Sequence, residues 1–185
     1  MIKNFLLTGR PRVGKTTLIR EVIQSFTPEG QGGRARQAGG FYTREIREKG
    51  KRIGFEIETL SGVRGILASV NGTHQRRAYR VGRYQVHLEE LERIGVQAIF
   101  EAVREREIVV IDEIGKMELL SMKFQDAVSV ALDSPKKVLG TIYQGSDPFV
   151  RRIQAREDVK TFTLTSDNFG EIKAIFELHI SERVE

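Results

Sequence analysis

The chain has 185 residues, a length that suits one domain with a well-buried core and is short for two. Hydrophobic residues make up 39% and charged residues 30%, which is typical of a globular protein and excludes a disordered one. The absence of cysteine excludes disulfides, thiol catalysis and zinc-thiolate sites. The formal charge is +5, but the basic residues are spread along the chain, so nucleic acid is a partner that is not favoured.

No apolar run approaches the roughly 20 residues of a membrane helix, so no membrane association is expected. The first eight residues are too few for a signal peptide and are better explained as a core strand. We therefore expect a soluble, cytoplasmic protein with a single domain over residues 1–185, and we favour a monomer.

The first predicted elements are an apolar strand at residues 2–8, a glycine-rich loop and a helix from about 15 to 26. The loop has the phosphate-binding pattern G-x-x-x-x-G-K-T. Its glycines let consecutive N–H groups face phosphate oxygens, and the helix adds the positive end of its dipole. Lys15 is expected to reach the β- and γ-phosphates as a catalytic residue, and Thr16 to ligate Mg²⁺. The predicted nucleotide-binding residues are Gly9, Arg10, Pro11, Arg12, Val13, Gly14, Lys15 and Thr16.

A glycine-rich tract at 28–40 predicts a mobile surface connection, with a basic lid that uses Arg34 or Arg36 as the alternative. Three short alternating segments follow at 41–46, 53–59 and 64–69, separated by turn residues. They predict an antiparallel meander, at about 40–69, attached to a parallel sheet.

Helical periodicity at residues 88–106 precedes a β-branched run that ends in two acids, Asp112 and Glu113. Such a run predicts a strand buried on both faces of a parallel sheet. Because side chains alternate along a strand, the two acids are expected to diverge and to have separate tasks. Asp112 fits an outer-sphere partner of Mg²⁺, and Glu113 fits a catalytic residue that orients and polarises an attacking water. The alternative is that the acids only cap the following helix.

The remaining predicted elements are a helix at 122–132, strands at 137–142 and 161–164, and a helix from 169 to about 181. Alternating strands and helices predict a three-layer α/β/α sandwich with its ligand at the carboxyl ends of the strands. Thr141 ends one of these strands, and is either a sensor of the γ-phosphate or an ordinary strand residue. His74, His87 and His179 lack acidic partners at metal or catalytic spacing and are predicted to be surface residues.

Five segments together resemble a known family: GRPRVGKTT from Gly9, GFYTREIR at 40–47, RIGFEI at 52–57, RVGRYQV at 80–86 and DEIGKMEL at 112–119. In this order and spacing they resemble the small P-loop nucleoside-triphosphatase family. Its human member is called the cancer-related nucleoside triphosphatase, and it has archaeal and bacterial relatives. The resemblance spans residues 1 to about 178. Glycine is usual in the family where this chain has Arg12.

The resemblance implies a P-loop fold of the additional-strand, catalytic-glutamate type. It also implies slow, Mg²⁺-dependent hydrolysis of ATP, GTP and other nucleoside triphosphates to the diphosphate and phosphate. No motif in the chain reads a base edge, so CTP and UTP are expected substrates too. The family's nucleotide-contacting segments map onto residues 9–16 and onto Ile108, Val109, Val110, Ile111, Asp112, Glu113, Ile114 and Gly115.

Arg44, Arg52, Arg80 and Arg83 lie in family-like motifs, and one of them is a candidate to stabilise transition-state charge. Two other functions remain open. One is a kinase for a nucleotide or another small molecule, with the meander holding the acceptor, although Glu113 favours water as acceptor. The other is a nucleotide-dependent switch associated with nucleic acid.

Overall fold

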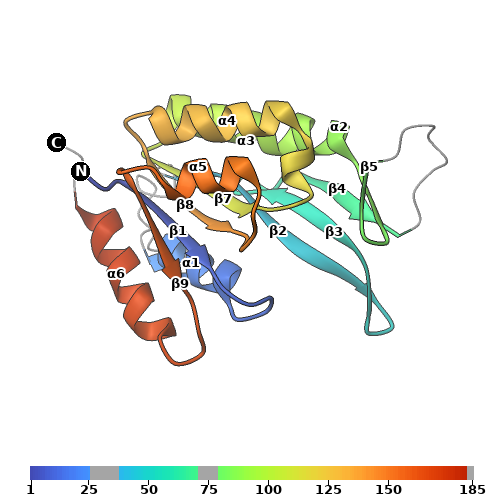
Figure 1. Cartoon of the computed structure of the whole chain (residues 1–185), viewed down its shortest axis with the longest axis horizontal. Helices are drawn as coiled ribbons and strands as arrows, with labels where there is room; N and C mark the ends of the chain where they lie inside the picture. Colours follow the sequence, from blue (N-terminus) through green and yellow to red (C-terminus); the bar gives the residue numbers. More distant parts are fainter. Residues whose placement is uncertain (26–37, 71–78, 183–185) are drawn as a thin grey trace.

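The computed structural model describes residues 1–25, 38–70 and 79–182 (Figure 1). In these ranges nine strands form one sheet in the order β5-β6-β4-β3-β2-β7-β8-β1-β9. The strands are β1 (Asn4–Thr8), β2 (Ala38–Glu48), β3 (Lys51–Thr59), β4 (Arg64–Ser69), β5 (Tyr79–Val81), β6 (Tyr84–Val86), β7 (Ile108–Ile114), β8 (Lys137–Ile142) and β9 (Val159–Thr163). The helices are α1 (Lys15–Ser25), α2 (Leu88–Glu90), α3 (Gln97–Glu105), α4 (Met122–Asp133), α5 (Pro148–Gln154) and α6 (Phe169–Ser181). A π-helical stretch, η1 (Leu91–Val96), joins α2 to α3, and η2 (Glu118–Leu120) is a 3-10 turn.

The sheet has a parallel half and an antiparallel half that meet at β2. This strand pairs in parallel with β7 and antiparallel with β3, which pairs antiparallel with β4. The predicted meander is confirmed. The predicted loop at 28–40 is wrong at its end, because Ala38, Gly39 and Gly40 belong to β2. A Cβ at Gly40 would collide with the Val110 carbonyl on β7, so glycine here reflects close strand packing. Arg34 and Arg36 lie outside the described residues.

Strand β8 lies between β1 and β7, so one extra strand separates the glycine-rich loop from the two acids. This order confirms the additional-strand fold. All five strands of the parallel half run in one direction, and their carboxyl ends therefore meet at one edge of the sheet. Nucleotide sites of α/β folds lie at such an edge.

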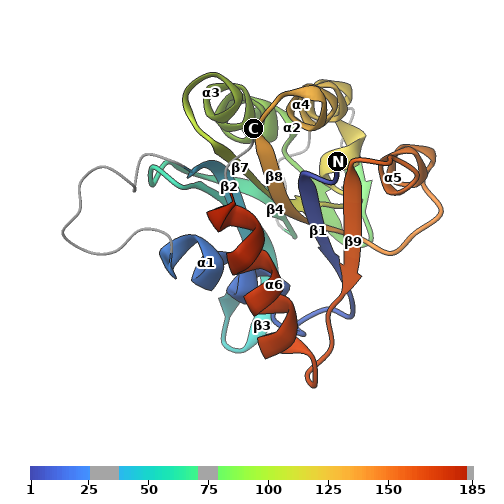
Figure 2. The same ribbon diagram turned by 90° about the vertical axis from the view of Figure 1, so that its left-hand side faces the viewer.

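Helices cover both faces of the parallel half, which confirms the three-layer α/β/α architecture (Figure 2). Side chains of β1, β7 and β8 alternate between two apolar clusters. Leu6 and Ile111 belong to the cluster on the sheet face covered by α3, α4 and α5. Leu7 and Val110 belong to the cluster on the face covered by α1 and α6. Because both faces are covered, these strands are apolar along their whole length. None of the described helices is long and apolar enough to cross a membrane.

Two features of the fold were not predicted. The hairpin of β5 and β6 has three residues in each strand, too few to show an alternating pattern. Helix α5 is also short, yet it carries a start signal: the Asp147 side chain accepts from the backbone N–H groups of Phe149 and Val150, and Pro148 follows the cap.

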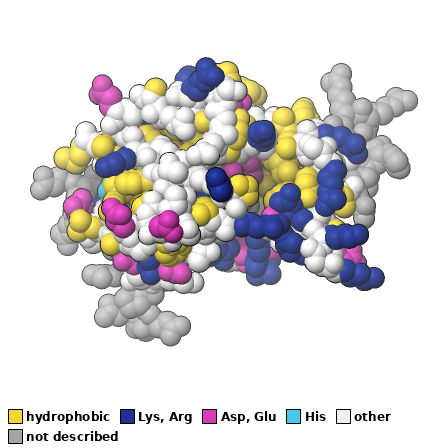
Figure 3. Space-filling view, turned by 60° about the horizontal axis from the view of Figure 1, so that its bottom comes forward, with side chains coloured by type: hydrophobic (Ala, Val, Ile, Leu, Met, Phe, Trp, Pro, Cys, Tyr) yellow, Lys and Arg dark blue, Asp and Glu magenta, His cyan; other side chains and the backbone are white. Residues whose placement is uncertain are grey.

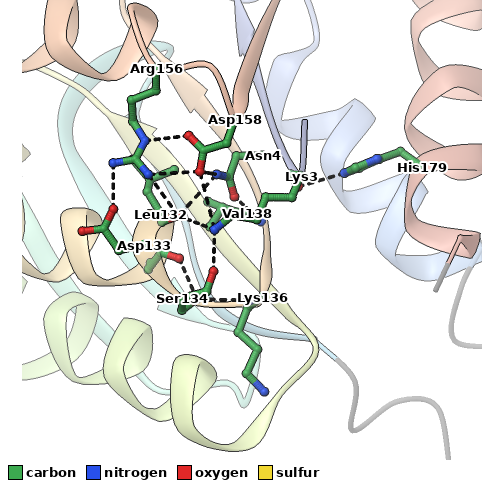
Figure 4. Close-up of polar contacts among 11 residues, drawn as sticks. Lys3, Asn4, Leu132, Asp133, Ser134, Lys136, Val138, Arg156, Asp158 and His179 are labelled. Carbon is green, nitrogen blue, oxygen red and sulfur yellow. Dashed lines mark hydrogen bonds and ion pairs between the residues drawn. The ribbon is translucent and has the colours of Figure 1, made fainter. Parts of the chain in front are cut away.

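Polar side chains tie together the amino ends of β1, β8 and β9, away from the loop (Figure 4). Asn4 is fully buried; its side chain donates to Asp158 at 3.1 Å and accepts from the Val138 N–H at 3.3 Å. Arg156 forms ion pairs with Asp133 and Asp158, both at 2.8 Å. These contacts satisfy buried polar groups and indicate a stabilising role for this edge.

His179 belongs to the same edge, so the prediction of a surface residue is wrong for it. Its ring stacks on Phe5 with centroids 3.7 Å apart, and its Nε2 lies 2.9 Å from the Lys3 carbonyl oxygen. Burial lowers the pKa of His179. His87 is half-buried and bonded to Ser69 at 3.0 Å, and His74 lies outside the described residues.

Candidate active site

The glycine-rich loop connects the end of β1 to the first residue of α1, as expected for a phosphate-binding loop. Gly9 and Gly14 have φ angles of 141° and 104°, which L side chains rarely adopt. A Cβ at Gly9 would also lie 2.6 Å from the Leu164 carbonyl oxygen. Arg12 has a φ of 66° although it is not glycine. The backbone thus has the curl that the sequence predicts, with an arginine at one of its left-handed positions.

Lys15 lies against the loop that precedes it. Its ammonium donates to the carbonyl oxygens of Gly9 at 3.1 Å and Arg10 at 3.2 Å. Leu18 donates to the Gly14 carbonyl at 2.8 Å, which begins the helical hydrogen bonding of α1. The lysine charge and the helix amino terminus therefore lie at the same end of the loop, where both would stabilise a bound anion.

Asp112 is placed beside this loop by β7 and is 1% exposed. Its Oδ1 accepts a hydrogen bond of 2.6 Å from the Thr141 hydroxyl on β8. Burial raises the pKa of Asp112, while the Thr141 and Thr16 hydroxyls and the charge of Lys15 act in the opposite direction. The structure therefore brings Lys15, Thr16, Asp112 and Thr141 together from three strand ends.

The oxygen atoms of this cluster fit a divalent cation. Asp112 Oδ2 is buried and has no hydrogen-bond partner within the described chain. The Thr16 hydroxyl lies close enough to the carboxylate to lower its pKa. Carboxylate and hydroxyl oxygens are hard ligands of the type that Mg²⁺ prefers. No group of three or more His, Asp or Glu residues suited to a metal exists within the described ranges. A cation here would take its other ligands from water and phosphate.

Glu113 follows Asp112 and is half-buried. Burial raises its pKa, the Asp112 charge raises it further, and Lys15 lowers it. The pairing of β7 with β8 shifts register between Ile111 and Ile114, so regular alternation is interrupted at the two acids. Their separate tasks remain a prediction.

Glu118, a residue without a role in the sequence-based interpretation, is 5% exposed and lies next to Glu113. A Cβ on Gly115 would lie 2.8 Å from Glu118 Oε2 and 3.2 Å from Glu113 Cδ, so both side chains pack on this glycine. Burial, then the charges of Glu113 and Asp112, raise the pKa of Glu118 to about 8. A glutamate in a polar turn ordinarily faces water, so only the resemblance of the segment DEIGKMEL to the family marked this position.

Replacing Glu118 with glutamine is expected to change the pH dependence of stability. Folding raises the pKa of Glu118 from 4.5 to about 8, so the protonated side chain stabilises the fold fully below about pH 4.5. This contribution to stability is lost as the pH rises through 8. Glutamine does not titrate. In thermal unfolding, the Tm of Glu118→Gln minus that of the wild type should therefore increase between pH 5 and 9, on the order of 5 °C. A difference that stays constant over this range would contradict a buried, protonated Glu118.

The segment between β9 and α6 forms another wall of the loop. Phe169, the first residue of α6, packs so closely that a Cβ on Gly14 would lie 3.2 Å from its ring. Asn168 accepts from the Thr165 N–H at 2.8 Å and donates to the Thr163 carbonyl at 3.0 Å, which fixes this turn. The contact of Phe169 with the loop was not predicted, because it joins residues far apart in sequence.

The four candidate arginines are not equivalent. Arg44 pairs with Glu56 and Glu58, and Arg52 pairs with Glu45 at 2.6 Å and donates to the Tyr84 hydroxyl at 2.8 Å. Arg83 lies near Arg52 and donates to its carbonyl oxygen. Arg80 is exposed on β5.

Another arginine, Arg20 on α1, lies closer to the acids. Its charge acts on the pKa of Asp112, and its guanidinium stacks over the Tyr42 ring at 4.2 Å. In the sequence, the helical spacing of apolar residues identifies Arg20 only as part of a helix.

Comparisons with known proteins give the family of the chain and support its fold. A family model described as "NTPase" matches residues 4–176. The chain belongs to this NTPase family. Nucleoside-triphosphatase THEP1 of Thermotoga petrophila is 51% identical over 163 residues, 88% of this chain and 84% of that protein. The human cancer-related nucleoside-triphosphatase is 39% identical over 182 residues, 91% of each chain.

Two solved structures of the NTPase family have the same fold. The solution structure of the human protein has a TM-score of 0.80 and 38% identity, and the match covers 99% of this chain and all of that one. The crystal structure of THEP1 from Aquifex aeolicus has a TM-score of 0.78 and 31% identity, covering 94% and 99%. Both the family and the fold predicted from the sequence are confirmed.

Proposed function

We propose that this member of the NTPase family hydrolyses nucleoside 5′-triphosphates to the diphosphate and phosphate, in a Mg²⁺-dependent reaction. The observation that carries the proposal is the meeting of Lys15, Thr16 and Asp112 at one edge of the sheet, with one Asp112 oxygen free. The relatives described above, nucleoside-triphosphatases of Thermotoga petrophila and man, support the reaction class.

The phosphate chain binds along the loop, where backbone N–H groups and the start of α1 favour negative charge. Lys15 moves from the carbonyls of Gly9 and Arg10 to phosphate oxygens, which are stronger acceptors for an ammonium. Phosphoryl transfer needs little covalent chemistry from the protein, so positioning and charge supply most of the rate.

Thr16 and Asp112 are the residues that would hold Mg²⁺, Thr16 directly and Asp112 through its free oxygen or a bound water. The cation neutralises negative charge on the β- and γ-phosphate oxygens when bound. Thr141 holds the other Asp112 oxygen, which fixes the orientation of the carboxylate. Its position beside Asp112 supports the proposal that Thr141 also senses the γ-phosphate.

Glu113 orients the attacking water and accepts its proton. Burial and the neighbouring acids raise the pKa of both Glu113 and Glu118, that of Glu118 to about 8. Glu118 is the more deeply buried of the pair and holds a proton at neutral pH, which leaves Glu113 as the carboxylate that faces the reaction.

Phosphate release with ATP alone, followed by addition of RNA, DNA or candidate acceptors, tests the proposal. Steady hydrolysis with Mg²⁺ and its loss with EDTA support it. A reaction that requires an acceptor, with transfer in place of phosphate release, would identify a kinase. Stimulation above about tenfold by RNA or DNA at physiological salt would favour the switch, because nonspecific electrostatic binding weakens steeply with salt. A monomeric, single-domain, cytoplasmic enzyme is part of the same proposal.

Hydrolysis of ATP, GTP, CTP and UTP is expected to differ by less than about tenfold in kcat/KM, equal to about 1.4 kcal/mol. The residues proposed for the site, Lys15, Thr16 and Asp112, would contact the phosphates and Mg²⁺, which do not differ among the four substrates. Steady-state assays with each triphosphate at equal Mg²⁺ check this prediction. A thousandfold preference for one base would reveal a base-reading pocket.

A further inference from the structure

A second cationic site lies beside the phosphate loop. It is a shallow, open pocket of about 540 Å³. Its walls come from the loop, the β2–β3 hairpin and the β5–β6 hairpin. We call it the arginine pocket, and its residues are Arg12, Arg47, Gly50, Arg52, Arg83 and Tyr84. In Figure 3, Lys and Arg side chains gather over the half of the molecule that holds these hairpins.

The charge of the arginine pocket is unbalanced. Glu45 is the acid that pairs with its arginines: it lies 3.5 Å from Arg12, 2.5 Å from Arg47 and 2.6 Å from Arg52. Arg156, at the far edge of the sheet, shows the opposite arrangement, with two acids around one arginine. Within the described residues, four guanidinium groups line the pocket and one carboxylate contacts them. This excess of positive charge favours the binding of an anion.

The guanidinium groups are held in place by the protein itself. Arg47 donates to the Gly50 carbonyl at 2.9 Å, Arg52 to the Tyr84 hydroxyl at 2.8 Å, and Arg83 to the Arg52 carbonyl. Each guanidinium carries five N–H groups in a planar fork, so these contacts leave donors for a ligand. Planar forks match the oxygens of phosphate, and ordering them in advance lowers the entropy cost of binding.

The arginine pocket lies beyond the end of the phosphate site. On β2, Phe41 is level with Ile111 of β7, and Glu45 is four residues further along. At about 3.3 Å per residue, this is roughly 13 Å past Ile111. Arg12 connects the two places, since its backbone belongs to the loop and its side chain lines the pocket. The pocket therefore adjoins the phosphate loop, on the side away from the end of β7.

We propose that the arginine pocket is a second anion site, which binds a small phosphate-class ligand: inorganic pyrophosphate or the phosphoryl group of a phosphorylated metabolite. It is distinct from the site of hydrolysis, and its occupant is not the substrate. The three walls and the net positive charge of the described residues carry this assignment.

Calorimetric titration of inorganic pyrophosphate into the Lys15→Ala protein tests the proposal, because this background weakens binding at the phosphate loop. Pyrophosphate should bind with a stoichiometry of one. Adding Arg83→Gln or Arg47→Gln should weaken binding by at least about tenfold, the loss of a charge-assisted contact. Arg83→Lys should weaken it less, because it keeps the charge. Arg104→Gln is the matched control and should have no effect, because Arg104 is an exposed arginine of α3 that pairs with its neighbour Glu105.

Four outcomes would overturn the assignment: no binding by the Lys15→Ala protein, binding that Arg83→Gln leaves unchanged, equal weakening by Arg104→Gln, or tighter binding of a 5′-phosphorylated oligonucleotide than of either small anion. Titration with glucose 6-phosphate identifies the source of the phosphate. Tighter pyrophosphate binding assigns the free anion, and tighter glucose 6-phosphate binding assigns a phosphorylated metabolite. Since the readout is binding, the result is independent of whether the chain hydrolyses triphosphates.

Discussion

Replacement of Lys15 with alanine is expected to abolish measurable hydrolysis, with kcat reduced on the order of 10²–10³-fold or more, and to weaken triphosphate binding strongly. The Lys15 ammonium already lies against the loop, 3.1 Å from the Gly9 carbonyl oxygen. Arg10 and Arg12 do not replace it, because both are exposed and Arg12 pairs with Glu45. The substitution therefore removes the cation that faces the phosphates.

Single-turnover phosphate release and equilibrium binding of ATP, with and without Mg²⁺, measure both effects. Lys123→Ala is the matched control, since Lys123 is an exposed lysine of α4 that pairs with Glu92. It should retain both activities. Near-normal turnover by Lys15→Ala would show that the site is elsewhere.

Glu113→Gln is expected to lower kcat on the order of 10²–10⁴-fold while ATP and Mg²⁺ still bind. Glutamine keeps the size and hydrogen-bonding shape of the side chain, but it lacks the charge that polarises water. Asp112→Asn is expected to act differently, with Mg²⁺ dependence and nucleotide binding weakened together. The asparagine oxygen can still accept from Thr141, so the local fold should persist.

The same binding and single-turnover assays, applied to both variants, separate the two acids. Near wild-type hydrolysis by Glu113→Gln would assign the general base to another group, such as the substrate's own phosphate. Equal loss of binding in both variants would mean that the acids maintain the shape of the loop. The alternation argument for their separate tasks would then be wrong.

Local patterns determined much of the fold. Apolar runs in β1, β7 and β8 have continuous hydrophobic faces because helices cover both sides, and this signal needs no knowledge of contacts. The glycine positions and Lys15 of the loop are likewise local, since a left-handed φ and a helix start within a few residues impose them. Short elements were not predicted, because the three residues of β5 are too few to show a hydrophobic period.

Tertiary structure alone decided which side chains meet. The order of strands places β8 between β1 and β7, and only this order brings Thr141 to within 2.6 Å of Asp112. Burial of Glu118 and of His179 depends on packing that polar sequence neighbours do not reveal. The arginine pocket joins three segments whose charges look dispersed along the chain. The phosphate loop, the buried strands and the family follow from the sequence alone, because each depends on residues that are neighbours in the chain. The environment of each charge depends on residues distant in sequence, which only folding brings together.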